Sequence, residues 1–175
     1  NWAVNAIQRL MEGGSGITTP DGRDVFANQF AYLRGLNMAP EAIYSDILMT
    51  VFHTPTSGNL HLCDIRNGAG EIALKASGAE EYFGLIYIGD TSAFMKLVED
   101  DASEMILEEY AISNSLFGGI HSPNTKVEIL IGAKKFMEGW NSWRVSNMGL
   151  LNIGRNEGPL IIQLFGRGVR LRGIK

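Results

Sequence analysis

The sequence predicts an α/β protein built on a parallel sheet with flanking helices. Residues 82–88 and 127–131 are continuous apolar runs of the kind that form buried strands. The first run leads into a pattern typical of a helix. A third apolar run, 148–153, is followed by Pro159, which can occupy the first turn of a helix. Strands that alternate with helices in this way indicate a parallel sheet with right-handed crossovers.

A helical segment is predicted ahead of this sheet, over residues 1–56. Residues 2–11 form a short amphipathic pattern, and 22–36 has apolar residues near helical spacing. Pro40 can begin a further helix, because its missing N–H would be unpaired in the first turn anyway. The apolar stripe of that helix is Ile43, Ile47, Leu48, Val51 and Phe52.

The remaining chain, 57–175, is predicted to be one domain that starts with a β-hairpin over 59–77. The two halves of the hairpin alternate polar and apolar residues around a loop, 66–70, that contains Asn and Gly. We expect these antiparallel strands to extend or flank the main sheet. Residues 102–117 have apolar residues near helical spacing and predict a second helix in this domain.

The composition is that of a globular protein. Hydrophobic residues make up 45% of the 175 residues and charged residues 19%. No apolar run reaches the roughly eighteen residues that a membrane-spanning helix needs, and no secretory signal is visible, so we expect no membrane partner. Cys63 is the single cysteine, which excludes a disulfide within the chain and fits a cytoplasmic protein best.

The net charge of −4 is unevenly distributed along the chain. Residues 126–175 contain nine Lys/Arg and three Glu, a balance of +6, whereas residues 1–125 contain six Lys/Arg and sixteen Asp/Glu, a balance of −10. Local charge decides whether a polyanion is attracted, because exposed charges more than about 10 Å apart are largely screened. Asn1 is not an initiator, and the chain stops five residues after Arg170, so we expect a fragment of a larger protein, with natural processing as the alternative.

The C-terminal region carries a set of residues suited to phosphate. If Pro159 begins a helix, Gln163, Arg167 and Arg170 stand at i, i+4 and i+7 and share one face. Arginine keeps its charge and offers a planar fork of donors, which suits a phosphoryl group. The alternative is a solvated basic helix face. Gly166 costs the helix about 1 kcal/mol and allows close backbone approach, which favours the functional interpretation.

The spacing Gln163-x-x-Gly166-Arg167-x-x-Arg170 resembles the glutamine-glycine-arginine signature that closes the second RecA-like domain of superfamily 2 helicases and translocases. The earlier segment 131–141 is similar to the preceding motif of that family, in which a strand runs into a loop that ends in Gly-x-Asp. Both segments are closest to the helicase (Res) subunit of type III restriction enzymes. The resemblance covers about residues 83–173 and implies that 57–175 is a RecA-like helicase C-terminal domain.

The resemblance implies roles at the ATP site. Arg170 would be the arginine finger on the γ-phosphate of ATP bound to the other RecA-like domain, and Arg167 would assist it. The residues placed at the nucleotide by the same resemblance are Gln163, Gly139, Asn141 and Gly166. In the family the Gly-x-Asp carboxylate reads a ribose hydroxyl, whereas Asn141 can accept a hydrogen bond but brings no charge.

The resemblance also implies contacts with DNA. Lys134 and Lys135 lie in the loop where relatives touch the nucleic-acid backbone, and Thr91 follows a strand end that meets the backbone in such helicases. A helix N-terminus favours phosphate. Asp90 would oppose it, so plain capping by Asp90 or Thr91 stays open as an alternative, and loop lysines are in general mostly solvated.

The implied function is that of an ATP-dependent DNA helicase or translocase, an ATP-hydrolysing enzyme. No Gly-x-x-x-x-Gly-Lys-Ser/Thr loop occurs in the sequence. ATP and Mg²⁺ would therefore be held mainly by an N-terminal RecA-like domain of the same chain, and these residues alone would be inactive. A type III restriction context would add a nuclease domain and a methyltransferase subunit.

The alternative function belongs to another class: a stand-alone doubly wound module that binds a small phosphorylated ligand or a protein partner. Such a module needs its own glycine-rich turn after the first strand, and Ile88-Gly-Asp-Thr is a poor one. His53, His61 and Cys63 are residue types that can bind a metal ion. Three candidate ligands without a fourth, and without a Cys-x-x-Cys pair, predict no metal.

Overall fold

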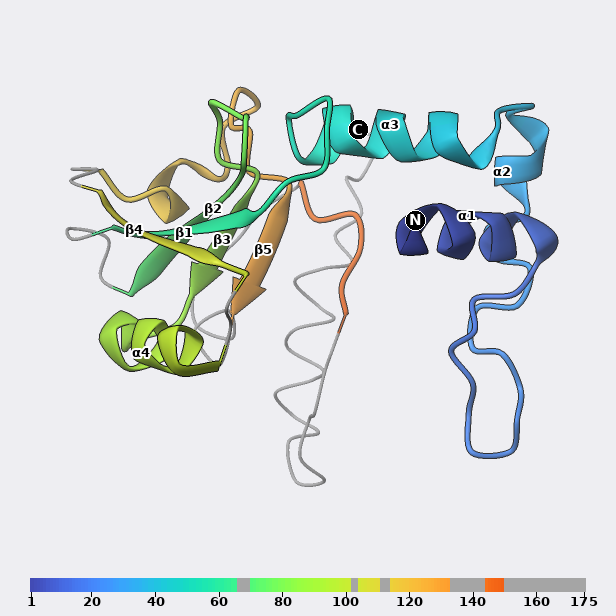
Figure 1. Ribbon diagram of the computed structural model, residues 1–175, viewed down its shortest axis with the longest axis horizontal. Helices are drawn as coiled ribbons and strands as arrows, with labels where there is room; N and C mark the ends of the chain where they lie inside the picture. The colour runs from blue at the N-terminus through green and yellow to red at the C-terminus, as the bar shows by residue number, and fades with distance from the viewer. Residues whose placement is uncertain (66–69, 102–103, 111–113, 133–143, 150–175) are drawn as a thin grey trace, which may run out of the picture. The chain divides into compact units, whose positions relative to one another are not determined.

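The computed structural model describes residues 1–65, 70–101, 104–110, 114–132 and 144–149. The chain divides into two compact units, Asn1–Ser57 and a second unit that begins at Gly58 (Figure 1). The first unit is helical and the second contains a five-stranded sheet, so the protein has an α/β fold. Among the described helices, none combines the length and apolar character needed to cross a bilayer.

The first helix, α1 (Trp2–Glu12), has a defined residue at each end. Asn1 Oδ1 accepts a hydrogen bond from the Ala3 N–H at 3.0 Å, which caps one of the free donors of the first turn. Gly13 ends the helix with φ 100°, a left-handed conformation that favours glycine. The predicted amphipathic helix at 2–11 is therefore confirmed.

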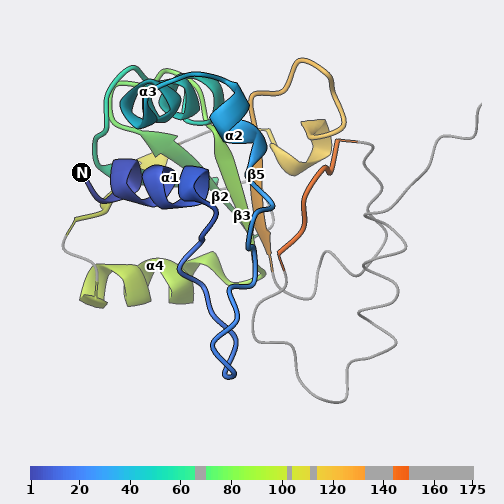
Figure 2. The same ribbon diagram turned by 90° about the vertical axis from the view of Figure 1, so that its right-hand side faces the viewer.

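The predicted helix at Pro40 is also confirmed, as α3 (Pro40–Val51), with its proline in the first turn. α1 and α3 pack against each other (Figure 2). Ile7, Ile43 and Leu48 are buried, whereas Ile47 is 37% exposed. The predicted stripe is thus only partly covered within this unit.

The predicted helix over 22–36 is wrong. The structure has turns there and one short helix, α2 (Tyr32–Gly35). The Asp24 carboxylate accepts hydrogen bonds at 2.7–2.9 Å from the backbone N–H groups of Ser15, Gly16 and Phe26. Asn28 then adopts a left-handed φ of 60°, which a continuous helix excludes. Local bonds from Asp and Asn side chains have outweighed the apolar spacing.

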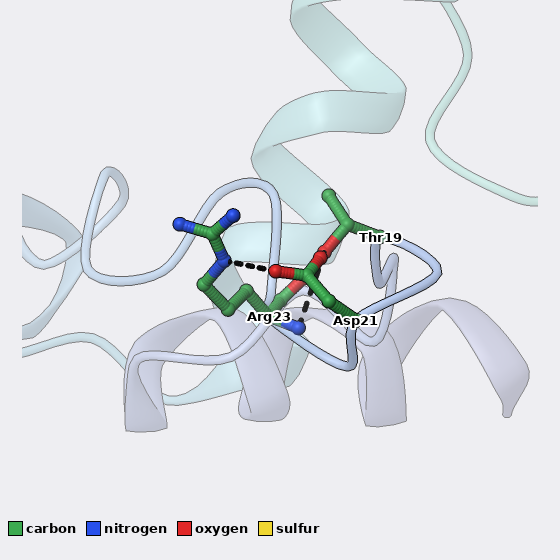
Figure 3. Close-up of polar contacts among 3 residues, drawn as sticks. All are labelled: Thr19, Asp21 and Arg23. Atoms are coloured by element: carbon green, nitrogen blue, oxygen red, sulfur yellow. Dashed lines mark hydrogen bonds and ion pairs between the residues drawn. The ribbon is translucent and has the colours of Figure 1, made fainter.

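A second carboxylate orders the tip of the same loop (Figure 3). Thr19 Oγ1–H donates to Asp21 Oδ1 at 2.5 Å, and Arg23 Nε–H donates to Asp21 Oδ2 at 2.6 Å. The hydrogen bond from Thr19, followed by that from Arg23, holds the pKa of Asp21 below its usual value. Thr19, Asp21 and Arg23 are all exposed or nearly so, so these bonds define a surface turn.

The sheet of the second unit has the strand order β4-β1-β2-β3-β5. Its strands are β1 (Leu60–Ile65), β2 (Glu71–Ala76), β3 (Gly84–Tyr87), β4 (Ile106–Tyr110) and β5 (Ile129–Gly132). β1 is parallel to β4, and β3 is parallel to β5, but β2 is antiparallel to both of its neighbours. The sheet is therefore mixed: it contains parallel pairs, as predicted, and both of its antiparallel pairs involve β2 of the predicted hairpin.

The predicted hairpin is confirmed, but its place in the sheet is not the predicted one. β1 and β2 pair antiparallel, with Cys63 opposite Ala73, and together they occupy the middle of the sheet instead of extending or flanking it. Ile72 and Ala73 are both 0% exposed, although they point to opposite faces of β2. A strand that is apolar on both faces is stable only where both faces are covered, which favours the centre.

The predicted helix over 102–117 is wrong as well. Its described residues include β4, which pairs in parallel with β1 so that Cys63 lies opposite Glu108, and the start of the 3₁₀ turn η1 (Phe117–Gly119). The segment Ile106-Leu-Glu-Glu-Tyr110 does not alternate with the period of a strand, so the pairing with β1, and not a local pattern, decides its conformation.

β3 confirms the buried strand predicted over 82–88 in shorter form, and it leads into α4 (Thr91–Asp101). β5 confirms the strand predicted over 127–131 but not its burial, because Ile129 and Leu130 are half-buried and Ile131 is 48% exposed. Asp90 Oδ1 accepts a hydrogen bond from the Ala93 N–H at 3.0 Å, so Asp90 caps α4 as predicted. Val98 is buried, while Glu99–Asp101 are exposed. The strand predicted over 148–153 lies outside the described residues except for Met148 and Gly149, which have no regular structure.

One face of the sheet is covered by the segment that connects β4 to β5. Cys63, Ile65, Ala73 and Leu85 form a buried cluster on this face together with Ile120 and Val127 of the connecting segment. Arg144 donates to the carbonyl oxygens of Ile120 and Val127, both at 3.2 Å, and so joins the two ends of that cover.

Candidate functional site

Most of the predicted site residues lie outside the described residues. These are Lys134, Lys135, Gly139, Asn141, Gln163, Gly166, Arg167 and Arg170. Thr91 is described: it is the first residue of α4 and is half-buried. The arginine-finger and nucleotide assignments therefore stay predictions.

Two of the predicted DNA-contacting segments follow strands whose carboxyl ends lie at the same end of the sheet. β3 and β5 are parallel neighbours, with Tyr87 opposite Gly132. The chain continues from β3 toward Thr91, and Lys134 comes two residues after the end of β5. Ligands of open α/β sheets gather at the carboxyl ends of such strands.

The start of α4 is occupied by a carboxylate. Asp90 Oδ1 uses the Ala93 N–H, one of the donors that a phosphate would need at this helix end. The capping alternative is therefore the one observed for Asp90, and a backbone contact by Thr91 stays a prediction.

The same end of the sheet contains a close approach of two glycines. Gly70, with φ 98°, precedes β2, and a Cβ on it would lie 3.0 Å from the Gly89 Cα and N atoms. The Ile88 N–H donates to the Gly70 carbonyl oxygen at 2.9 Å. Only glycine fits at position 70, and the close contact fixes where the chain leaves β3.

A group of hydrogen-bonded polar residues, which we call the His61 relay, crosses one face of the sheet. It consists of Ser77, His61, Glu108 and Cys63. His61 Nε2 lies 2.8 Å from Ser77 Oγ, and His61 Nδ1 lies 2.5 Å from Glu108 Oε1. The Cys63 thiol donates to Glu108 Oε2 at 3.3 Å. The side chains of His61 and Glu108 are only 15% and 18% exposed.

The relay is assembled by strand pairing. His61 and Cys63 are two residues apart on β1 and share a face, and the parallel register brings Glu108 of β4 opposite Cys63. Ser77 directly follows β2, and its N–H donates to the Asn59 carbonyl oxygen at 3.0 Å. Three separate stretches of sequence therefore meet around one imidazole.

The ionisation states follow from these bonds. Burial raises the pKa of Glu108, but the hydrogen bonds from His61 and Cys63 outweigh it, and the net pKa is lowered. Burial, followed by the hydrogen bond to Glu108, raises the pKa of Cys63 to about 12. Glu108 is therefore a carboxylate at neutral pH, and Cys63 is a protonated thiol that acts as a donor.

Lys75 adds a positive charge beside the relay. It lies opposite His61 in the β1–β2 register, and its Nζ lies 5.9 Å from the centre of the Tyr82 ring. Its charge contributes to lowering the pKa of Glu108 and partly counters the raised pKa of Cys63. The charge of Lys75 therefore adds to the hydrogen bonds of the His61 relay in stabilising the ionised carboxylate of Glu108.

A second buried carboxylate, Glu71, has a structural role. It is 2% exposed and accepts hydrogen bonds from the N–H groups of Leu116 and Phe117 at 2.8 and 3.1 Å, and from the Ser115 hydroxyl. Phe117 stacks on Tyr87 with ring centres 4.4 Å apart. Glu71 therefore holds the turn before η1 against the sheet.

Sequence reasoning placed His61 and Cys63 on one strand face but missed the relay. Its partners are 16 to 47 residues apart, and Glu108 lies in a stretch that was predicted to be helical. The β-branched Ile106 and the aromatic Tyr110, two residue types that are enriched in strands, are the available signal. Within the described ranges, no group of three or more His, Cys, Asp or Glu residues could hold a metal ion.

Comparisons of the chain with protein-family models, curated proteins and solved structures gave no match.

Proposed function

We propose that this chain is the second RecA-like domain of an ATP-dependent DNA helicase or translocase of superfamily 2, similar to the Res subunit of type III restriction enzymes. The observation that carries the proposal is Gln163-x-x-Gly166-Arg167-x-x-Arg170, preceded by the motif-like segment 131–141 in the family's order. Both segments follow the start of β5 along the chain.

The sheet supports the proposal in two respects. β1, β3, β4 and β5 all run in one direction, as is expected of the parallel framework of a RecA-like domain. β3 and β5 are neighbours, so the segments expected to contact DNA begin at one end of the sheet. β2 departs from the parallel pattern, and the proposal treats it as a strand added within this framework.

The charge distribution supports a nucleic-acid partner. Residues 126–175 have a balance of +6, from nine Lys/Arg and three Glu, and they contain Lys134 and Lys135. Phosphate contacts by lysine and arginine supply most of the affinity of sequence-independent binding. DNA backbone binding by this region would position the motor without reading sequence.

The proposed chemistry is divided between two domains. Arg170 and Arg167 would stabilise the charge that develops on the transferred phosphoryl group, and Gln163 would bind near the phosphates. The sequence contains no Gly-x-x-x-x-Gly-Lys-Ser/Thr loop. The metal and the triphosphate-binding loop would therefore come from a neighbouring RecA-like domain, and a type III context would add a nuclease domain and a methyltransferase subunit.

The first test uses the reading frame that encodes this chain. The proposal predicts an upstream Gly-x-x-x-x-Gly-Lys-Ser/Thr loop, and it predicts that the purified product hydrolyses ATP faster in the presence of duplex DNA. A frame without such a loop, or a product with no ATPase activity with or without DNA, would contradict it.

A second test measures the salt dependence of DNA binding. Replacing both Lys134 and Lys135 by Gln should weaken binding to all duplex sequences alike and reduce the slope of log K against log salt by about 2, since each phosphate contact contributes about 0.9. Lys96→Gln on the exposed surface of α4 is the matched control. An unchanged slope in the double variant would remove these lysines from the DNA site.

A further inference from the structure

The order of groups in the His61 relay is that of a nucleophile, a base and a carboxylate. Ser77 Oγ lies 2.8 Å from His61 Nε2, and His61 Nδ1 lies 2.5 Å from Glu108 Oε1. The imidazole therefore bridges a hydroxyl and a carboxylate through its two different nitrogens. Such an arrangement is recognised by geometry and roles, since it recurs on unrelated folds in different sequence orders.

The proton positions follow from the bonding partners. A carboxylate can only accept, so the proton between His61 and Glu108 belongs to Nδ1. In the neutral imidazole Nε2 is then the acceptor, and the hydrogen bond with Ser77 runs from the hydroxyl to Nε2. This is the tautomer in which His61 can take the proton of Ser77 as the hydroxyl attacks an electrophile.

We propose that Ser77 is a nucleophile activated by His61 and Glu108, and that it reacts with carboxylic esters by acyl transfer. The site is separate from the proposed ATP site and does not depend on it. Glu108 and Cys63 are positioning residues. The Cys63 thiol occupies Glu108 Oε2 and leaves Oε1 to orient the imidazole.

The backbone around Ser77 supports this assignment. Ser77 is half-buried at the end of β2, and Gly78 follows it with φ 81°, a left-handed turn that favours glycine. In the described part of the chain no acceptor is assigned to the Gly78 N–H. The N–H that follows a nucleophile is the donor best placed to bind the oxyanion that forms on attack.

A small residue that lies just before β1, Gly58, also faces Ser77. A Cβ at Gly58 would lie 2.7 Å from the Ser77 Cβ, so any larger residue there would displace the serine. We expect Gly58→Ala to shift Ser77 relative to His61.

The reaction balances with an ester and water. Ser77 Oγ bonds to the carbonyl carbon while its proton moves to His61 Nε2, and the tetrahedral intermediate then expels the alkoxide, which takes that proton and leaves as an alcohol. Water repeats the sequence on the acyl-serine and releases a carboxylic acid. Glu108 stays ionised throughout and stabilises the imidazolium.

The test is covalent labelling of the folded wild-type protein by a fluorophosphonate probe, which phosphonylates activated serines with loss of fluoride. Intact mass should show one adduct, and peptide mapping should place it on Ser77. Ser77→Ala should abolish the adduct, and His61→Gln should slow its formation by roughly 10²-fold or more, the usual contribution of a general base. Ser92→Ala, which changes an exposed serine of α4, should label like wild type.

A pre-steady-state measurement separates activation of Ser77 from its packing. Hydrolysis of p-nitrophenyl butyrate by wild type should show a burst of about one equivalent of nitrophenolate, and Glu108→Gln should lower the acylation rate while thermal unfolding and circular dichroism confirm that the variant is folded. Folded wild-type protein that gives no adduct on Ser77, or an adduct on another residue that survives Ser77→Ala, would overturn the proposal. That result does not depend on whether any variant folds, and it leaves the ATPase prediction unaffected.

Discussion

Two carboxylates organise the two units, and they draw their donors from very different distances along the chain. Asp24 binds groups at most nine residues away, mainly backbone N–H groups of one surface loop. Glu108 binds His61 and Cys63, which precede it by 47 and 45 residues. Asp24 shapes a turn that is already local, whereas Glu108 can bind its partners only after β1 and β4 have paired. The consequences of removing them should differ accordingly.

The largest expected effect is at Glu71, the most buried carboxylate of the sheet unit among the described residues. Glu71→Ala removes the carboxylate that accepts from the part-buried N–H groups of Leu116 and Phe117, so we expect a loss of about 3 kcal/mol in the free energy of unfolding. Urea denaturation measures it. Glu80→Ala, at an exposed position, is the control and should change stability by less than about 0.5 kcal/mol.

Glu108→Ala should cost somewhat less, about 2 kcal/mol, because its side chain is 18% exposed and water can partly replace it. The lowered pKa of Glu108 also predicts how its contribution to the free energy of unfolding changes with pH. The stabilising contribution of Glu108 is fully present above the pKa that its carboxyl has in the unfolded chain. This contribution is lost as the pH falls through the lower pKa that Glu108 has in the folded chain. Urea denaturation across this acidic range should therefore show a shallower pH dependence for Glu108→Gln than for wild type. Equal slopes would mean that the hydrogen bonds to His61 and Cys63 do not persist in solution.

The raised pKa of the Cys63 thiol predicts that the protein loses stability at alkaline pH. Its pKa rises from 9.0 to about 12 on folding, so the folded chain keeps a proton that the unfolded chain loses. The contribution of Cys63 to the free energy of unfolding is fully present below pH 9. Above pH 9 the free energy of unfolding should fall by about 1 kcal/mol per pH unit. Cys63→Ala should remove that slope in urea titrations between pH 9 and 10.5, and a slope identical to wild type would contradict the assignment.

The smallest effect is expected at Asp24. Asp24→Ala frees the N–H groups of Ser15, Gly16 and Phe26, but these lie in a surface loop where water can bind them. We expect faster hydrogen exchange at these amides and little change at the buried amides of α1 and α3. Global destabilisation as large as that of Glu108→Ala would remove the distinction between the local and the long-range carboxylate.

The same distinction explains which parts of the fold the sequence could predict. α1, α3 and the hairpin were predictable because their signals are local: Gly13 and Pro40 bound helices, and an Asn- and Gly-containing loop separates two alternating segments. The cap of α4 by Asp90 is equally local. No long-range contact is needed to favour any of these conformations.

The errors arose where two local signals competed or where strand pairing decided. Asp24 and Asn28 override the apolar spacing of 22–36, and both residue types were visible as breakers of a helix. The segment of β4 is predicted to be helical because Ile106 and Tyr110 stand at i and i+4, and only the pairing with β1 selects the strand. The hairpin is central because β4 pairs with β1 and β3 pairs with β2. No local sequence pattern predicts which strands pair with the two outer sides of a hairpin.

The candidate sites also differ in whether they depend on local sequence or on strand pairing. The proposed ATP and DNA residues come from short motifs that can be read directly from sequence. The His61 relay depends on three stretches brought together by pairing, and it required the register of β1 with both β2 and β4. Its carboxylate could not be identified while residue 108 was assigned to a helix.

The central claim is that Arg170 acts on ATP held by a neighbouring domain. The most direct measurement is DNA-stimulated ATP turnover by the protein that contains this chain, with Arg170→Ala compared with Arg172→Ala, which removes the same charge two residues away. We predict that Arg170→Ala lowers kcat by roughly 10³-fold or more while the variant stays folded and binds DNA, and that Arg172→Ala stays within about threefold of wild type. Equal turnover by the two variants would contradict the claim.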